Sequence, residues 1–193
     1  MSASPRPNYT AASLLDVAVR VFNERGYDGT SMGDLAAALG ITKSSIYHHV
    51  AGKDALLGLA LDRALSALFA VLDEPASTTG RARDRLEHVV RRSVAVLDAE
   101  LPFVTLLLRV RGNTPTEQDA LERRREFDRR VAELVAQAVD DGDLRADLDP
   151  SLVTRLLFGT VNSLVEWYRP GRGASADEVA DALVEMTLRG LER

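Results

Sequence analysis

Lysine and histidine are concentrated in one short stretch of an otherwise arginine-rich chain. The only two lysines, Lys43 and Lys53, and two of the three histidines, His48 and His49, lie within residues 30–53. Their ammonium and imidazole groups, with the hydroxyls beside them, can form hydrogen bonds to phosphates and base edges. From residue 42 to the end of this stretch there is no acidic side chain to repel phosphate. These residue types therefore indicate contact with a nucleic acid.

Apolar residues in the same stretch have the spacing of two short helices joined by a tight turn. Ala36, Gly40 and Ile46 stand at relative positions 5, 9 and 15. A helix-turn-helix needs a small residue, a glycine and an apolar anchor at these places. The spacing predicts helices over 32–39 and 43–50. The outer side of the second helix then carries Lys43, Ser44, Ser45, Tyr47, His48 and His49.

Helical signals dominate the rest of the chain, and no sustained alternating run predicts a strand. We therefore expect an all-α protein of about nine helices. A flexible tail over 1–9 should precede a helix-turn-helix domain over 10–53 and a larger helical domain over 54–193. Residues 73–80 are predicted to form a loop, and 169–173 a turn. The expected helices span 10–25, 32–39, 43–50, 53–72, 81–99, 102–111, 115–141, 150–168 and 175–192.

The composition argues against several other classes of protein. The net charge of −5 is unevenly divided, because residues 1–53 hold five basic and four acidic side chains whereas 54–193 hold nineteen and twenty-five. There is no cysteine, and no cluster of histidines and acids has metal-site spacing. No apolar run suits a membrane span, and residues 1–9 lack the core of a signal peptide. We expect a cytoplasmic protein that is not an enzyme and has no catalytic residues, metal or cofactor.

A series of short motifs runs in order through residues 11–57. The motifs are Phe22–Tyr27, Thr30-Ser31, Asp34-Leu35-Ala36, Leu39-Gly40-Ile41, Tyr47–Val50 and Lys53-Asp54. This series resembles the DNA-binding domain of the tetracycline-repressor (TetR) family of transcriptional regulators. The chain departs from the usual pattern at Val50, where phenylalanine is common, and at Asp54, where glutamate is common. The resemblance implies a homodimer whose two recognition helices enter successive major grooves of a palindromic double-stranded DNA operator.

The resemblance also implies a role for each polar residue of the segment. Bases are expected to meet Lys43, Ser44 and His48, and phosphates to meet Thr30, Ser31, Tyr47, His49 and Lys53, with Thr42 and Ser45 completing the DNA-binding set. Packing offers alternatives for three of them. Tyr47 would brace the helices, His49 would pack between the recognition helix and the next helix, and Lys53 would be a solvated charge at a helix start.

Residues 54–193 are expected to bind a second copy of the chain and a small-molecule effector. The last two helices are apolar on more than one side, so they should form the homodimer interface or, alternatively, close an intrachain core. Asn162 and Glu166 lie one turn apart and would orient a ligand or pair at an interface. His88 is expected to be a core or surface residue. By the resemblance, the ligand pocket is lined by Leu97, Phe103, Leu106, Leu107, Val110, Phe127, Phe158, Asn162, Val165, Glu166 and Trp167.

Arginine is concentrated between residues 109 and 130. Guanidinium groups suit phosphate or carboxylate, so this stretch either binds a ligand or forms a solvated face paired with neighbouring acids. Residues 106–125 and 166–170 are similar to actinobacterial TetR-family members that respond to acyl-coenzyme A thioesters. This similarity implies a ligand-responsive repressor with an acyl-coenzyme A effector. A regulator that binds DNA constitutively, without an inducer, is the alternative.

Overall fold

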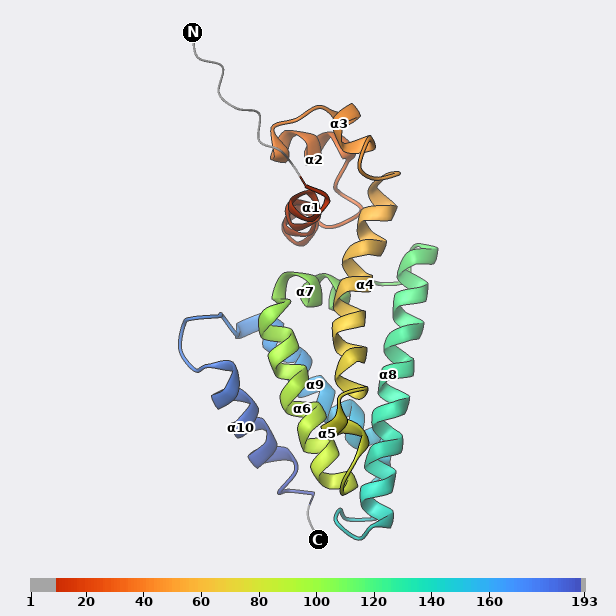
Figure 1. Cartoon of the computed structure of the whole chain (residues 1–193), viewed down its shortest axis with the longest axis vertical. Coiled ribbons are helices and arrows are strands. Elements are labelled where there is room, and N and C mark those ends of the chain that lie inside the picture. Colours follow the sequence, from red (N-terminus) through yellow and green to blue (C-terminus); the bar gives the residue numbers. More distant parts are fainter. Residues whose placement is uncertain (1–9, 192–193) are drawn as a thin grey trace.

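A computed structural model describes residues 10–191 and is all-α over that range, with ten helices (Figure 1). The predicted fold class is confirmed. The predicted tail, residues 1–9, lies outside the described residues. The helices are α1 (Ala11–Arg25), α2 (Met32–Leu39), α3 (Lys43–Tyr47), α4 (Lys53–Leu72), α5 (Pro75–Thr78), α6 (Ala82–Ala99), α7 (Leu101–Arg109), α8 (Pro115–Asp140), α9 (Pro150–Trp167) and α10 (Ala176–Thr187).

Local capping signals set many of the helix ends. Thr10, Ser31 and Ser175 each accept a hydrogen bond from the third helical amide, and the side chain of that third residue returns the contact in a capping box. Gly26 and Gly40 follow α1 and α2 with φ angles of 80° and 68°, which residues with a Cβ rarely adopt. These signals are visible in the sequence, so the predicted helix starts agree with the observed ones to within one residue.

The segment between α4 and α6 differs from its prediction. The sequence predicts a loop over 73–80, but Pro75–Thr78 form the short helix α5. Proline suits the first turn of a helix because it has no amide hydrogen to leave unpaired. The buried hydroxyl of Ser77 fastens this turn by donating a hydrogen bond of 2.5 Å to Val71 O.

The second helix of the helix-turn-helix is shorter than predicted. α3 ends at Tyr47 rather than Val50, because the amides of His49 and Val50 both turn back to Ile46 O, at 2.9 and 3.1 Å. His48 and His49 therefore lie in the turn after the helix.

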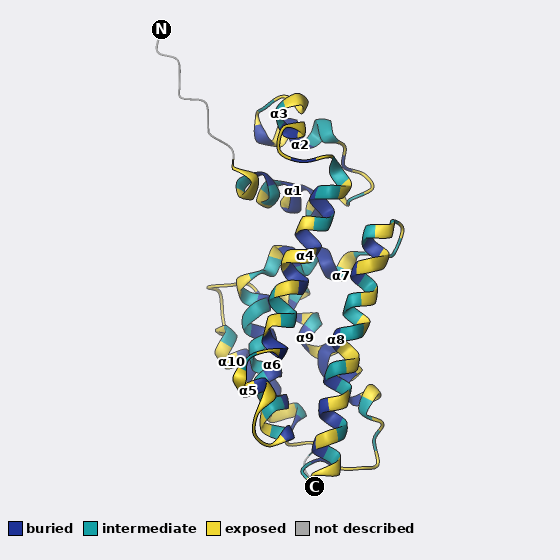
Figure 2. Ribbon diagram, turned by 45° about the vertical axis from the view of Figure 1, so that its right-hand side comes forward, coloured by how far each residue is buried: buried dark blue, intermediate teal, exposed yellow. Residues whose placement is uncertain are grey.

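Two clusters of buried side chains organise the molecule. The N-terminal cluster joins α1, α2 and α3 to the first half of α4, and also takes in Phe103, Leu106 and Leu107 of α7. The C-terminal cluster joins the end of α4 to α6, α8, α9 and α10. α4 runs from one cluster into the other, as Figures 1 and 2 show. The packing of the N-terminal unit therefore continues past residue 53 into α4 and α7.

The composition of α4 follows from this position. Among the described residues, α4 is the one helix that is long and apolar enough to cross a membrane by length and composition. Core helices pass the same test, and α4 packs against α1, α6, α7 and α8. Its apolar residues are accounted for by burial in both clusters.

The connection between α7 and α8 is fixed by one buried carboxylate. Glu117, which is buried, accepts hydrogen bonds from the amides of Arg111, Gly112 and Asn113 at 3.1, 2.8 and 2.8 Å. Three amides converging on one oxygen hold the chain reversal firmly. The end of α7 is thereby fixed relative to the start of α8.

Candidate nucleic-acid interface and internal cavity

The helix-turn-helix is assembled as its spacing predicts. Ala36 and Ile46 are buried in the N-terminal cluster, and Gly40 reverses the chain between α2 and α3 in the left-handed conformation. Val50 fills the apolar position that follows the second helix. α3 is held at the end of the molecule opposite the C-terminus (Figure 1), so its outer side faces solvent.

Seven of the ten predicted DNA-contacting residues are exposed, and five of them lie on α3 and the turn after it. Tyr47 is 53 % exposed, and Lys43, Ser44, His48 and His49 are exposed as well. The exposure of His49 argues against its packing between α3 and α4, whereas the half-buried Tyr47 remains compatible with bracing the helices. Their assignment to bases or phosphates stays a prediction.

The hydroxyls of the segment are already engaged within the protein. Thr30 is buried and donates a hydrogen bond of 2.7 Å to a backbone carbonyl of the preceding turn. The expectation that the Thr30 side chain meets the DNA backbone therefore does not hold. Ser31 donates to the Asp34 carboxylate at 2.6 Å, and the Thr42 hydroxyl lies 2.9 Å from that of Ser45. The hydroxyls of Ser31, Thr42 and Ser45 border the exposed surface and stabilise the starts of α2 and α3.

The two lysines occupy different settings on the same surface. Lys43 lies across Gly33 at the start of α2, so that a Cβ on Gly33 would stand 2.9 Å from Lys43 Cε. Lys53 donates a hydrogen bond of 2.9 Å to Tyr27 O, and its Nζ lies 4.1 Å from the centroid of the Tyr27 ring. Burial, aided by the neighbouring Asp54, raises the pKa of Tyr27 to about 12. Lys53 is therefore a partly buried anchor between α4 and the loop after α1, and not a solvated charge.

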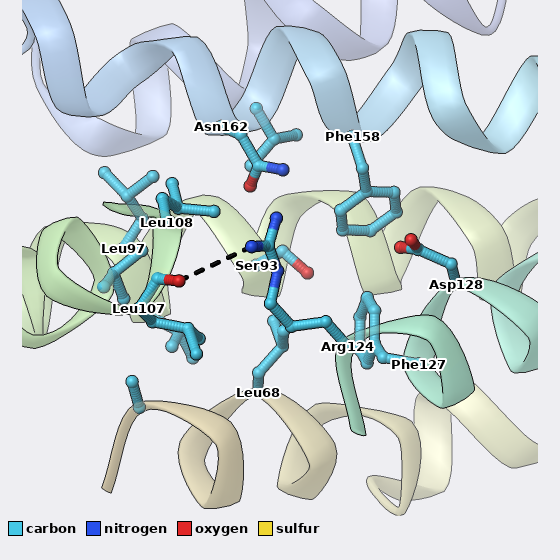
Figure 3. Close-up of a pocket in the computed structure, with 14 residues that line it drawn as sticks. Leu68, Ser93, Leu97, Leu107, Leu108, Arg124, Phe127, Asp128, Phe158 and Asn162 are labelled. Carbon is cyan, nitrogen blue, oxygen red and sulfur yellow. Dashed lines mark hydrogen bonds between the residues drawn. The ribbon is translucent and has the colours of Figure 1, made fainter. Parts of the chain in front are cut away.

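A cavity of about 50 Å³ lies between α4, α6, α7, α8 and α9 (Figure 3). Most of its wall is apolar, and four polar side chains interrupt it: Ser93, Arg124, Asp128 and Asn162. Apolar cavities with a few polar groups are typical ligand sites, although this one is small for a ligand of ordinary size. The full lining is Ala64, Leu68, Ser93, Val96, Leu97, Val104, Leu107, Leu108, Arg124, Phe127, Asp128, Phe158, Val161 and Asn162.

Less than half of the predicted pocket residues line this cavity. Leu97, Leu107, Phe127, Phe158 and Asn162 do. The other six do not line it, although Leu106 and Val110 line a separate pocket beside the end of α1. Phe103 and Leu106 belong to the N-terminal core and Val110 packs against it, Val165 packs against the C-terminal core, Glu166 is exposed, and Trp167 is 57 % exposed.

The sequence reasoning missed the two charged residues of the cavity. Burial lowers the pKa of Arg124 and raises that of Asp128, because each charged form loses hydration there. A signal was present, because Arg124 falls on the same stripe of α8 as Ala120, Phe127 and Val131, all of which are buried. A charge on an apolar stripe is a departure from the helical pattern that needs a cause.

A pair of hydrogen bonds ties the cavity wall to the helix-turn-helix. Asn23, near the end of α1, donates through Nδ2 to Pro102 O at 2.8 Å, and its own carbonyl accepts from Arg109 Nη1 at 3.0 Å. Pro102 and Arg109 lie at opposite ends of α7. One residue of α1 therefore holds both ends of a helix that also supplies Leu107 to the cavity.

The other charged residues singled out in the sequence mostly pair within the protein. Arg123 and Arg130 reach Asp62 and Asp73 at 2.9 and 3.3 Å, and Arg129 pairs with Glu126. These contacts support the paired-face interpretation for that part of the arginine-rich stretch.

His88, predicted as a core or surface residue, is partly buried at the edge of α6. Its Nε2 lies 2.6 Å from the Glu74 carboxylate. Burial opposes the charge of Glu74, but hydrogen bonds from His88 and Arg92 hold the pKa of Glu74 below its usual value. Within residues 10–191 no group of three or more histidines and acids is arranged to hold a metal ion.

Large apolar side chains are exposed on α9 and α10. Leu152 and Leu156 of α9 are 47 % and 64 % exposed, and Met186 of α10 is 76 % exposed. Such side chains, gathered on two helices, are typical of a protein–protein interface.

The fold and the exposed helix-turn-helix define a DNA-binding regulator with a helical effector domain. The family model described as "Bacterial regulatory proteins, tetR family" matches residues 14–60, and that described as "Tetracyclin repressor-like, C-terminal domain" matches residues 79–191. The HTH-type transcriptional repressor KstR2 of Rhodococcus jostii is 33 % identical over 181 residues, which cover 92 % of this chain and 89 % of the relative. The chain belongs to the TetR family and is a DNA-binding transcriptional regulator.

Solved structures agree with this assignment. SCO3833, a TetR-family member from Streptomyces coelicolor A3, is 58 % identical, with a TM-score of 0.89 over 100 % of this chain and 96 % of its own. AibR, solved in complex with isovaleryl coenzyme A and operator DNA, has a TM-score of 0.80 at 24 % identity, over 92 % of this chain and 97 % of its own. At that identity the likeness to AibR concerns the fold.

Proposed function

We propose that this regulator is a homodimeric repressor that releases a palindromic operator when an acyl compound, such as an acyl-coenzyme A thioester, occupies the cavity. The observation that carries the proposal is the position of the cavity. α4 and α7 both contribute to its wall and both pack against α1 of the helix-turn-helix unit. An effector that separates these helices would therefore act on the DNA-binding surface.

The DNA-binding half of the proposal rests on the outer side of α3 and the turn after it. Lys43, Ser44, Tyr47 and the two histidines form an exposed polar surface without an acidic residue. The shortened α3 places Lys43 and Ser44 on the helix, where they would enter a major groove. The protein would work in the cytoplasm, where bacterial DNA is found.

Dimerisation is supported by the exposed apolar face of α9 and α10. Two helices from each subunit would form a four-helix interface around a twofold axis, in which the same surface is buried on both copies. A dimer also suits operator binding, because its recognition helices can reach half-sites about 34–36 Å apart.

The effector half of the proposal depends on a difference in affinity. A ligand shifts the equilibrium between operator-bound and free states only by as much as it prefers one of them. The cavity of about 50 Å³ holds no more than a few waters' worth of space, so an acyl chain has to displace its walls. AibR, with the same fold, binds isovaleryl coenzyme A, which supports this class of effector for the present chain.

Fluorescence polarisation tests the proposal. The purified chain is titrated onto DNA from the region upstream of its own gene, and short-, medium- and long-chain acyl-coenzyme A thioesters are then added, with free coenzyme A as control. We expect salt-sensitive operator binding that one class of thioester reverses and free coenzyme A does not. Absence of binding to any nearby intergenic DNA at low salt would overturn the proposal, and binding that no acyl compound reverses would favour the constitutive regulator.

A further inference from the structure

Arg124 stands in the cavity wall without a carboxylate partner. Its guanidinium points into the space between α8 and α9 (Figure 3), and the one hydrogen bond that it forms within residues 10–191, to Leu107 O, is long at 3.4 Å. Asp128 is one turn away, but no ion pair within 4.0 Å joins the two residues in the described part of the chain. A guanidinium has five N–H donors, so most of its hydrogen-bonding capacity is unused by the protein.

The position of Arg124 is costly for the protein. It interrupts the buried stripe of α8 between Ala120 and Phe127 and faces apolar side chains from α4, α7 and α9. Partial burial lowers the pKa of Arg124, and the charge of the nearby Asp128 only partly opposes this shift. A charge in such a place destabilises the unliganded fold unless an acceptor reaches it.

A second polar group faces the same space. Asn162 of α9 points into the cavity on the side opposite Leu68, with the Arg124 guanidinium between them (Figure 3). Phe127 and Phe158 pack edge to face beside this pair, with ring centroids 5.2 Å apart. The cavity therefore combines a donor pair at its centre with an aromatic and aliphatic wall.

We infer that Arg124 binds the acyl oxygen of the effector, which is the carbonyl oxygen of a thioester or the carboxylate of a free acid. Asn162 would donate a second hydrogen bond to the same group, and the hydrocarbon would lie against Phe127 and Phe158. This inference rests on the proposed function and deepens it, because it names the chemical group that the site recognises.

Occupation of the site would also change a contact of α7. An acyl oxygen competes with Leu107 O for the Arg124 guanidinium, because a short charge-assisted hydrogen bond is stronger than the present one of 3.4 Å. Leu107 lies on the helix whose two ends are held by Asn23 of α1. Binding of the acyl group to Arg124 would thus change the contacts between α7 and the helix-turn-helix unit.

The substitution Arg124→Met tests the inference, with Arg125→Met as a matched control. Methionine keeps much of the length of arginine and removes the charge. Arg125 is the exposed neighbour, outside the cavity lining. We expect R124M to melt at or above the wild-type temperature, because the substitution removes an unpaired charge from the apolar cavity wall. An Arg124 that supported the fold would instead make R124M less stable than R125M.

Ligand binding is measured by thermal shift and calorimetry on the purified protein. The probes are short-, medium- and long-chain acyl-coenzyme A thioesters, the matching free acids, the matching primary alcohols and free coenzyme A. We expect the best probe to bind R124M about tenfold or more weakly than wild type, a difference of at least one strong hydrogen bond, and to bind R125M as wild type does. Tighter binding of the free acid than of the thioester identifies the carboxylate as the group read by Arg124, and the reverse identifies the thioester carbonyl.

Two results would overturn the inference. One is equal affinity of wild type and R124M for the best probe, and the other is the absence of a thermal shift with every acyl probe. Neither result depends on DNA. Operator binding is scored separately by polarisation, so a failure of the proposed repressor function is distinguishable from a failure of Arg124 to read the acyl group.

Discussion

Lys43 and Lys53 serve one surface through different contacts. The Lys53 ammonium is held by Tyr27 O and the Tyr27 ring, so it joins α4 to the loop after α1. Lys43 is exposed and lies over Gly33, with no hydrogen bond to the described part of the protein. Lys53 therefore contributes to folding as well as to the charge of the surface, whereas Lys43 contributes its charge and reach alone.

Alanine substitutions should separate these roles. We expect Lys53→Ala to lower the free energy of unfolding by about 1 kcal/mol, because it removes one hydrogen bond and one cation–π contact. It should also reduce affinity for operator DNA and for random DNA to the same extent. Lys43→Ala should leave stability unchanged and reduce affinity for the operator more than affinity for random DNA. Urea unfolding and polarisation with both DNAs at several salt concentrations provide the measurements. Equal losses of stability in the two variants would contradict the assignment.

At the scale of single elements, α2 depends on a cap that responds to pH. The hydroxyl and amide of Ser31 donate to the Asp34 carboxylate at 2.6 and 2.8 Å, and Arg25 lies 3.4 Å away. The hydrogen bonds from Ser31, aided by the charge of Arg25, hold the pKa of Asp34 below its usual value. The folded pKa is lowered, so this stabilisation is present above the unfolded value and is lost as pH falls through the folded one.

We predict that Asp34→Asn lowers the stability of the helix-turn-helix at neutral pH and that the difference from wild type shrinks below about pH 4, where both states of Asp34 become protonated. The measurement is urea unfolding, followed by circular dichroism, of both proteins from neutral to acid pH. Asp119→Asn, at an exposed position of α8, serves as an acidic control outside any cap. A difference that stays constant down to the lowest pH would show that the carboxylate charge is not what stabilises the cap.

α7 is the element that joins the cavity to the DNA-binding unit. Removing the Asn23 side chain breaks the 2.8 Å bond to Pro102 O at one end of this helix, while Arg109 still holds the other end. We expect Asn23→Ala to increase amide hydrogen exchange in α7, because the helix opens locally at lower cost. It should also reduce the effect of a bound effector on operator affinity about threefold or more.

Hydrogen exchange with mass spectrometry measures the first effect, and polarisation with and without effector measures the second. Glu24→Ala changes the neighbouring exposed residue and is the control. Unchanged exchange in α7 would mean that Asn23 does not hold the helix.

Sequence patterns predicted the elements better than the cavity, and the reason is physical. Helix starts depend on local features such as Thr10, Ser31 and Ser175, which are visible in the chain itself. The sequence predicted Phe103 and Leu106 in the lining, and they lie outside this cavity, because their apolar character fits either core equally well. Only the tertiary packing of α7 against α1 and α4 decides which core receives them.

The charged residues of the cavity illustrate a second limit. α8 contains many arginines, and composition alone does not separate Arg124 from Arg123, which pairs with Asp62. The helical period does separate them, because Arg124 shares the buried stripe with Phe127. The predicted DNA-binding residues, by contrast, lie together because they are adjacent in sequence, and Thr30 alone among them is buried, by a local turn.

The helix-turn-helix and the last two helices lie toward opposite ends of the molecule. α3 lies beyond one end of α4, and α9 and α10 lie alongside its other half (Figures 1 and 2). The cavity lies between them. In a dimer joined through α9 and α10, movement of α4 and α7 would change the distance between the two α3 helices. That distance has to match the spacing of the operator half-sites for both helices to bind.

Leu156→Glu should therefore abolish the dimer and, with it, operator binding. Leu156 is 64 % exposed at the centre of the apolar face of α9, and at a twofold interface the substitution would place two carboxylates in apolar surroundings. Leu59→Glu is the control, because Leu59 is 51 % exposed on α4, away from that face. Sedimentation should give a monomer for L156E and a dimer for L59E. On random DNA the salt dependence of L156E should fall to about half that of the dimer, because each bound unit releases half as many counterions. If L156E remained a dimer with wild-type operator affinity, the dimer interface would have to lie on another surface of the molecule.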